Sequence, residues 1–152
     1  MLQILVGPRQ VGKTTAICRF PVRKYSPRAI RVRTSSPKLI VRNNALITAL
    51  RGIPFEQTFL DRAFYGRLVE NAVGAALINA EEDVFYWSDR DKEVDLIVQR
   101  GEDLLAIEIT AGDGHPTPGL NIFRKRYPHA HTVRIGGANA DLSVERFFEY
   151  GF

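Results

Sequence analysis

The stretch Val84–Thr110, VFYWSDRDKEVDLIVQRGEDLLAIEIT, decides the fold because it reads as three consecutive antiparallel strands. The first segment, 84–87, consists of aromatic and β-branched residues, which favour strands. The second, 93–99, and the third, 104–110, alternate apolar with polar residues, and a period of two is the signature of a half-buried strand. Gly101 lies in the last connection, where it can adopt a positive φ. The sequence therefore predicts an antiparallel meander.

The alternation also assigns the side chains of the second strand to opposite faces of the sheet. One face takes Val94, Leu96 and Val98, and the other takes Asp95 and Ile97. Asp95 is thus expected among apolar neighbours, where an unpaired charge is costly.

Two carboxylates are expected to face each other across this meander. A two-residue turn at Gly101 and Glu102 places Asp95 opposite Glu108, with Cβ atoms about 4.5–5.5 Å apart. The two groups repel unless a cation bridges them or one is protonated. Since Mg²⁺ and Mn²⁺ prefer oxygen ligands, one interpretation is a metal site at Asp95 and Glu108. Two alternatives stay open: the face is solvated at a sheet edge, or a bulge or longer turn shifts the register.

The composition is that of an ordinary globular chain. It has 152 residues, of which 45% are hydrophobic and 25% charged, enough to bury one core. The single cysteine, Cys18, excludes an internal disulfide framework, so we expect a cytoplasmic protein. No apolar run approaches the roughly eighteen residues of a membrane span, and the short run at the start is not a secretory signal. We expect no membrane association.

Charge is distributed unevenly along the chain. Residues 1–55 contain eleven Lys and Arg and no acidic residue, whereas residues 56–152 contain ten basic and seventeen acidic residues. A basic segment can bind phosphate-rich partners such as DNA or RNA, or an acidic protein surface. It can equally neutralise the acidic half of the same chain.

The N-terminal segment contains a phosphate-loop motif. A short apolar strand at 2–6 precedes Gly7, and the pattern continues with Gly12, Lys13 and Thr14. Glycines let backbone amides surround a phosphate, Lys13 would contact the β- and γ-phosphates of ATP, and Thr14 would hold Mg²⁺. The parallel strands and second acidic residue of an ATPase are missing, so this chain alone is not expected to hydrolyse ATP.

The remaining elements follow from periodicity, capping residues and turn residues. The proline- and arginine-rich segment 21–37 reads as a linker. We expect a strand at 38–41, a helical turn at 43–50, a loop at 53–59, a helix at 61–80, a basic helix at 119–126, a strand at 131–135 and a terminal helix at 143–150.

Two further sets of residues have open interpretations. Glu70 stands one residue from the apolar stripe of the 61–80 helix. Periodicity favours a boundary residue in water, and the alternative is that Glu70 points toward the sheet and joins Asp95 and Glu108. His129 and His131 share a strand face, but no third ligand stands near them, so we interpret them as surface residues.

Several segments resemble one prokaryotic family. LVGPRQVGKTT resembles the opening of AAA-type phosphate-loop ATPases, and most of the chain resembles the C-terminal domain of those proteins, called domain of unknown function 4143. The matching segments of that domain are SSPKLIVRNNALITAL, GRLVENAVGAALIN and the Val84–Thr110 stretch.

That domain is similar to the restriction-endonuclease-like PD-(D/E)XK core, in which acidic residues and a lysine surround a metal. The resemblance implies an α/β fold with a mixed sheet and flanking helices. It implies catalytic roles for Glu70, Asp95 and Glu108, and its lysine position falls on Thr110. Thr110 cannot supply a positive charge, and Lys92 or Lys125 would have to substitute.

The resemblance also implies a shortened chain, because only about twenty residues separate the phosphate loop from the Ser-Pro-Lys-Leu stretch. We expect a phosphate-loop remnant at 1–20, a basic linker at 21–37 and a nuclease-like domain at 38–152. The leading hypothesis is binding of nucleic acid or a protein partner without catalysis. The alternatives are a nuclease that uses Mg²⁺ or Mn²⁺, and a protein that binds ATP through its phosphate loop.

Overall fold

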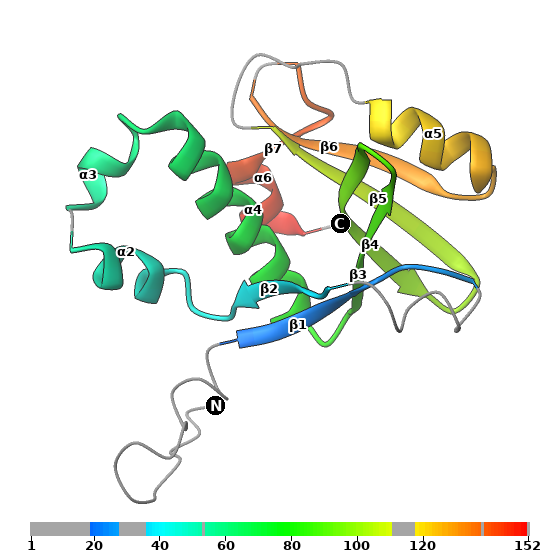
Figure 1. Ribbon diagram of the computed structural model, residues 1–152. Helices are drawn as coiled ribbons and strands as arrows, with labels where there is room; N and C mark the ends of the chain where they lie inside the picture. Colours follow the sequence, from blue (N-terminus) through cyan, green and yellow to red (C-terminus); the bar gives the residue numbers. More distant parts are fainter. Residues whose placement is uncertain (1–18, 28–35, 53, 111–117, 138, 152) are drawn as a thin grey trace, which may run out of the picture.

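The computed structural model describes residues 19–27, 36–52, 54–110, 118–137 and 139–151. Its centre is a seven-stranded mixed sheet in the order β2-β1-β3-β4-β5-β6-β7 (Figure 1). The strands are β1 (Arg19–Lys24), β2 (Lys38–Val41), β3 (Asp83–Asp89), β4 (Lys92–Arg100), β5 (Asp103–Thr110), β6 (His131–Gly136) and β7 (Leu142–Ser143). The helices are α2 (Ala45–Arg51), α3 (Phe55–Thr58), α4 (Arg62–Asn79), α5 (Pro118–Arg126) and α6 (Val144–Tyr150).

The predicted meander is confirmed. Strands β3, β4 and β5 pair antiparallel, and the β4–β5 ladder runs from the pair Leu96–Ile107 to the pair Arg100–Asp103. A two-residue turn joins the two strands, and its Gly101 has a φ of +64°. This is the predicted register, and the ladder ends at Leu96–Ile107, one position before Asp95 and Glu108.

The predicted alternation within β4 is wrong, because the strand contains a bulge. Phe85 pairs with Ile97, but the next pair joins Trp87 to Val94, so β4 has one residue more than β3 in this interval. An extra residue shifts the side chains beyond it to the other face. Val94 therefore packs with Ile97 in one cluster, whereas Leu96 packs in the other.

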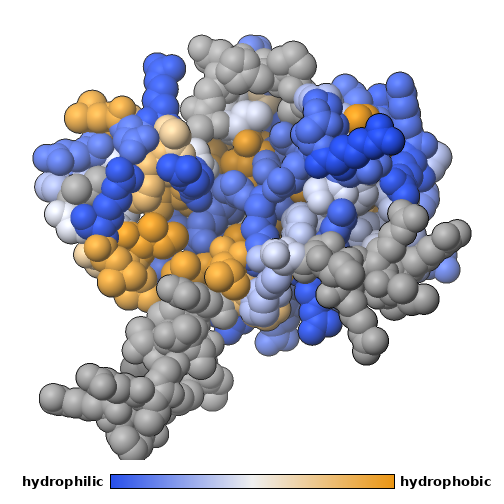
Figure 2. All heavy atoms as spheres, viewed as in Figure 1, coloured by the Kyte–Doolittle hydropathy of each residue, from blue (hydrophilic) through white to orange (hydrophobic). Residues whose placement is uncertain are grey.

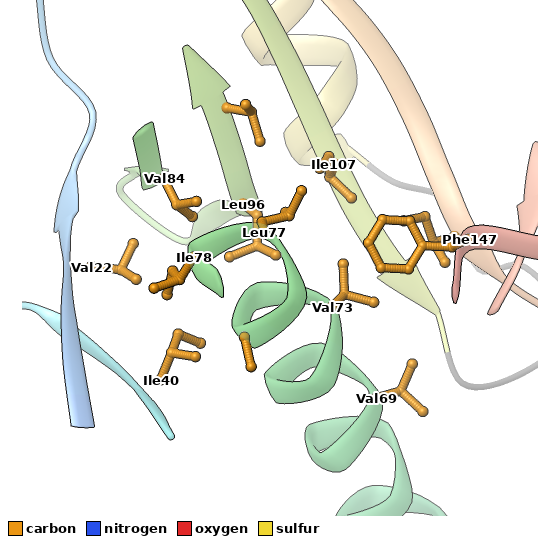
Figure 3. Packing of buried hydrophobic residues seen from close by; sticks show 13 residues of the cluster. Val22, Ile40, Val69, Val73, Leu77, Ile78, Val84, Leu96, Ile107 and Phe147 are labelled. Carbon is orange, nitrogen blue, oxygen red and sulfur yellow. The ribbon is translucent and has the colours of Figure 1, made fainter. Parts of the chain in front are cut away.

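Helix α4 covers one face of the sheet. Asp61 begins the helix by accepting a hydrogen bond from the Phe64 amide at 2.9 Å. The helix buries a wider face than the predicted stripe, and it contacts β2, β3 and β5 of the sheet. Figure 3 shows its inner side chains facing those of the sheet and of α6. The labelled members are Val22, Ile40, Val69, Val73, Leu77, Ile78, Val84, Leu96, Ile107 and Phe147.

Helix α5 covers the opposite face with a second, aromatic cluster. Phe123 is fully buried, and its ring centre lies 5.4 Å from that of Trp87 and 4.6 Å from that of Tyr127. Gly119 is needed for this packing, because a Cβ there would lie 1.8 Å from the Glu93 carbonyl oxygen. The helix thus rests directly on the backbone of β4.

The segment predicted as a linker contributes to the sheet. Residues 21–24 lie within β1, which pairs antiparallel with β2 and parallel with β3. Val22 is completely buried, and burial between two strands outweighs the local proline signal. The loop predicted at 53–59 is also wrong, since α3 occupies 55–58. The other predicted helices and strands lie within one or two residues of their expected bounds.

Some predictions fall outside the described residues. These are the phosphate loop with the strand before it, and residues 28–35 of the predicted basic linker, which include Arg28, Arg31 and Arg33. Among the described helices, none is both long and apolar enough to cross a membrane.

Candidate functional site

A lysine surrounded by carboxylates forms the candidate site. Lys38, the first residue of β2, places its Nζ 2.6 Å from Oε1 of Glu70 in α4 and 2.8 Å from Oε1 of Glu93 in β4. The same Nζ lies 3.7 Å from Oδ1 of Asp95. Three elements that are distant in the sequence therefore meet at one ammonium group.

The bulge in β4 positions Asp95. The β4–β5 ladder ends at the pair Leu96–Ile107, and beyond it Oδ2 of Asp95 accepts a hydrogen bond from the Ile109 amide at 2.9 Å. The Asp95 carboxylate thus accepts the hydrogen bond of the Ile109 amide beyond the end of the β4–β5 ladder. Its other oxygen, Oδ1, remains directed to Lys38.

The electric field of the site favours proton uptake by two carboxyls. Burial, followed by the charge of Glu70, raises the pKa of Asp95 to about 6, although the Ile109 hydrogen bond and Lys38 oppose the rise. Burial, followed by the charges of Asp95 and Glu93, raises the pKa of Glu108 to about 8. Near neutral pH, Glu108 is therefore mostly protonated.

The same carboxylates keep Lys38 in its charged form. Burial alone would lower its pKa, but the charge and hydrogen bond of Glu70, the hydrogen bond of Glu93 and the charge of Asp95 outweigh it. The net result is a pKa raised above 10.5, so Lys38 is permanently charged at physiological pH.

The site has an unused oxygen ligand. Oε2 of Glu108 is buried and has no hydrogen-bond partner. Glu70, Glu93 and Asp95 contact the Lys38 ammonium, and Glu108 adds a fourth carboxyl to the same field, so negative charge is in excess when all four are ionised. A buried, unsatisfied carboxylate oxygen in such a field fits a hard divalent cation. As the side chains stand, no three His, Cys, Asp or Glu among the described residues form a metal-binding group.

The structure brings two of the predicted residues, Glu70 and Asp95, to the ammonium of Lys38, a lysine that the sequence analysis did not single out. Glu70, Asp95 and Glu108 influence one another electrostatically, and Glu70 contacts the cluster through Lys38 rather than standing in water. Lys38 occurs in the Ser-Pro-Lys-Leu segment, but only the pairing of β2 with β1 brings it to the carboxylates. Glu93 was also missed as a member of the site.

The proposed substitute lysines are not in these contacts. Lys92 forms its ion pair with Asp91 at 2.8 Å. Lys125 lies exposed on α5, the helix that covers the opposite face from α4. His129 and His131 are exposed, in line with their interpretation as surface residues.

Residues 65–149 match a known family, the domain of unknown function DUF4143. The chain belongs to the DUF4143 family. No curated protein and no solved structure shows significant similarity to it. The part that matches DUF4143 contains Glu70, Glu93, Asp95 and Glu108, whereas Lys38 precedes it.

Proposed function

We propose that this DUF4143 protein cleaves phosphodiester bonds of nucleic acid with a divalent cation, as a nuclease of the PD-(D/E)XK type. The observation that supports the proposal is the position of Lys38. Its ammonium lies among Glu70, Glu93 and Asp95 and supplies the positive charge that Thr110 lacks.

Asp95 and Glu108 are the residues that would hold Mg²⁺ or Mn²⁺, with Glu70 beside them. A divalent cation held there would polarise the phosphate and lower the pKa of a water molecule. Holding the cation requires Glu108 to lose its proton, since its pKa of about 8 leaves it mostly neutral at pH 7. Metal binding is therefore expected to strengthen as the pH rises toward 8.

Lys38 would act on the substrate phosphate. Glu70 and Glu93 accept two of the three N–H donors of the Lys38 ammonium, which keeps its charge and leaves one donor for a substrate. Donation from Nζ to a phosphate oxygen stabilises the charge that develops there during cleavage. Glu108 has a pKa near neutrality, which suits a group that accepts or releases a proton during the reaction.

Binding of nucleic acid or a protein partner without cleavage is the second candidate. Thr110 at the lysine position favours it, and so do the ion pairs of Lys38, which already neutralise part of the cluster. Nucleotide binding at Gly7, Gly12, Lys13 and Thr14, and the relation to AAA-type ATPases, remain separate proposals. A melting temperature raised by ATP in the wild type but not in Lys13→Ala would support nucleotide binding.

The deciding experiment is a thermal melt with and without Mn²⁺. We expect Mn²⁺ to stabilise the wild type and Asp91→Ala, an exposed control, but not Asp95→Ala. Cleavage of DNA and RNA in Mn²⁺ is then compared between the wild type and Lys38→Met. The nuclease proposal requires metal binding in both proteins and cleavage only in the wild type. Metal binding without any cleavage by the wild type would favour the second candidate.

A further inference from the structure

A pocket beside the candidate site is assigned to no function so far. It has a volume of about 440 Å³, within the range of small-ligand pockets. Its walls are mainly apolar and include Leu39, Ile47, Phe64 and Leu68 from β2, α2 and α4. Figure 2 shows hydrophobic side chains gathered over α2 and β2, next to a hydrophilic region.

The pocket and the carboxylate cluster share two residues. Lys38 and Glu70, which form the 2.6 Å ion pair, also line the pocket. A ligand that fills the pocket therefore touches the group proposed to contact the scissile phosphate. Arg67 lines the pocket too, is exposed, and forms no ion pair within the described ranges.

This combination defines the chemistry of the ligand. The ligand needs an apolar body for the pocket and an anionic group for Arg67 and Lys38. An unstacked nucleobase attached to its phosphate has both parts, and Phe64 offers an aromatic surface. One face of the Phe64 ring is covered by the Arg51 guanidinium, whose Cζ lies 3.8 Å from the ring centre, so the ring is held in place.

We propose that this pocket binds one nucleobase next to the scissile phosphate and thereby selects single-stranded nucleic acid. Bases stacked inside a duplex cannot enter such a pocket without being unpaired. This inference rests on the proposed nuclease function and adds its substrate class. An apolar side chain of a protein partner is the competing occupant.

The test measures binding of a fluorescent single-stranded 12-mer, its duplex, and the 12-mer with abasic positions, all in Ca²⁺ to suppress cleavage. Phe64→Leu keeps an apolar wall but removes the ring. We expect it to weaken single-strand binding roughly 5- to 150-fold, the range of one lost stacking contact. Phe59→Leu removes a half-exposed ring outside the pocket and should bind like the wild type.

A second pair of variants changes exposed side chains, which contribute less to the core. Leu39 is 54% exposed and lines the pocket, whereas Leu50 is 88% exposed and does not. Leu39→Ser should weaken single-strand binding several-fold, and Leu50→Ser should not. Melting temperatures measured in parallel confirm that each variant is folded.

The outcomes separate the two proposals. Preference for the single strand that is lost with abasic positions and with Phe64→Leu supports the pocket assignment. Equal binding of single strand, duplex and abasic strand overturns it, and so does a Phe64→Leu variant that binds like Phe59→Leu. Base-dependent binding without Mn²⁺-dependent cleavage overturns the nuclease proposal alone.

Discussion

Replacing Glu108 by Gln is expected to stabilise the protein at alkaline pH. The pKa of Glu108 is about 8 in the folded state and 4.5 in its ordinary state. Between these values the folded protein retains a proton that the unfolded chain has released. Raising the pH through this window therefore favours unfolding, and the loss of stability levels off above pH 8. Gln does not titrate, so the stability of the variant does not decrease through this group as the pH rises.

The magnitude follows from the two pKa values. The gap between 4.5 and about 8 corresponds to about 5 kcal/mol at 1.36 kcal/mol per pKa unit. Glu108 as a whole residue is only half-buried, and water screens part of the field, so we expect about 2–3 kcal/mol. In a domain of this size that corresponds to a melting temperature about 4–12 °C higher at pH 8.5. At pH 4.5 the two proteins should differ little.

The assay is thermal unfolding of the wild type and Glu108→Gln from pH 4.5 to 8.5, without divalent cations. Glu102→Gln is the matched control, because Glu102 is exposed in the turn between β4 and β5. The control should follow the wild type at every pH. Equal melting temperatures of wild type and Glu108→Gln at pH 8.5 would refute the argument from burial and carboxylate repulsion.

Three further perturbations test the geometry of the site. Lys38→Met leaves the carboxylates without their cation, and should lower the melting temperature by about 5–10 °C at pH 7. The decrease should be smaller at pH 5, because proton uptake by the carboxylates relieves their repulsion. Differential scanning fluorimetry measures the melting temperature at each pH. Gly119→Ala introduces a Cβ 1.8 Å from the Glu93 carbonyl oxygen, and a loss of about 1–3 kcal/mol in urea unfolding is expected. Asn71→Ala leaves the amide and carbonyl of Val41 without their side-chain partner, and should cost about 2–4 kcal/mol in the same assay.

Local patterns predicted the centre of the fold well, because the β4–β5 hairpin depends on nearby residues. Period two and a glycine turn predicted the register of the hairpin correctly from Leu96–Ile107 to Arg100–Asp103, and the ladder ends just before Asp95 and Glu108. The bulge in β4 could not be predicted, since no Gly or Pro marks it and the sequence Glu93–Leu96 still alternates polar with apolar residues. β1 was missed because its stability comes from pairing with two other strands, while its own sequence contains Pro21.

The residues of the candidate site also divide into those that local sequence patterns bring together and those that only long-range strand pairing brings together. Asp95 and Glu108 belong to one hairpin, so local geometry alone brings them together. Lys38 reaches them only because β1 pairs with both β2 and β3, which are far apart in the sequence. Which face of the sheet the Glu93 side chain occupies depends on the bulge in the pairing of β4 with β3, and this pairing is not visible in the sequence. A single sequence without those pairings gives no means to join Lys38 to the cluster.

The position of Lys38 is fixed by neutral contacts as well as by charge. Asn71 in α4 accepts a hydrogen bond from the Val41 amide and donates one to the Val41 carbonyl oxygen, both at 2.8 Å. Because Asn71 is the neighbour of Glu70, the same helix turn holds the end of β2 and supplies a carboxylate to its beginning. Removing the charge of Lys38 should therefore leave β2 in place. A loss of cleavage in Lys38→Met that retains metal binding would thus report on the missing ammonium and not on a displaced strand.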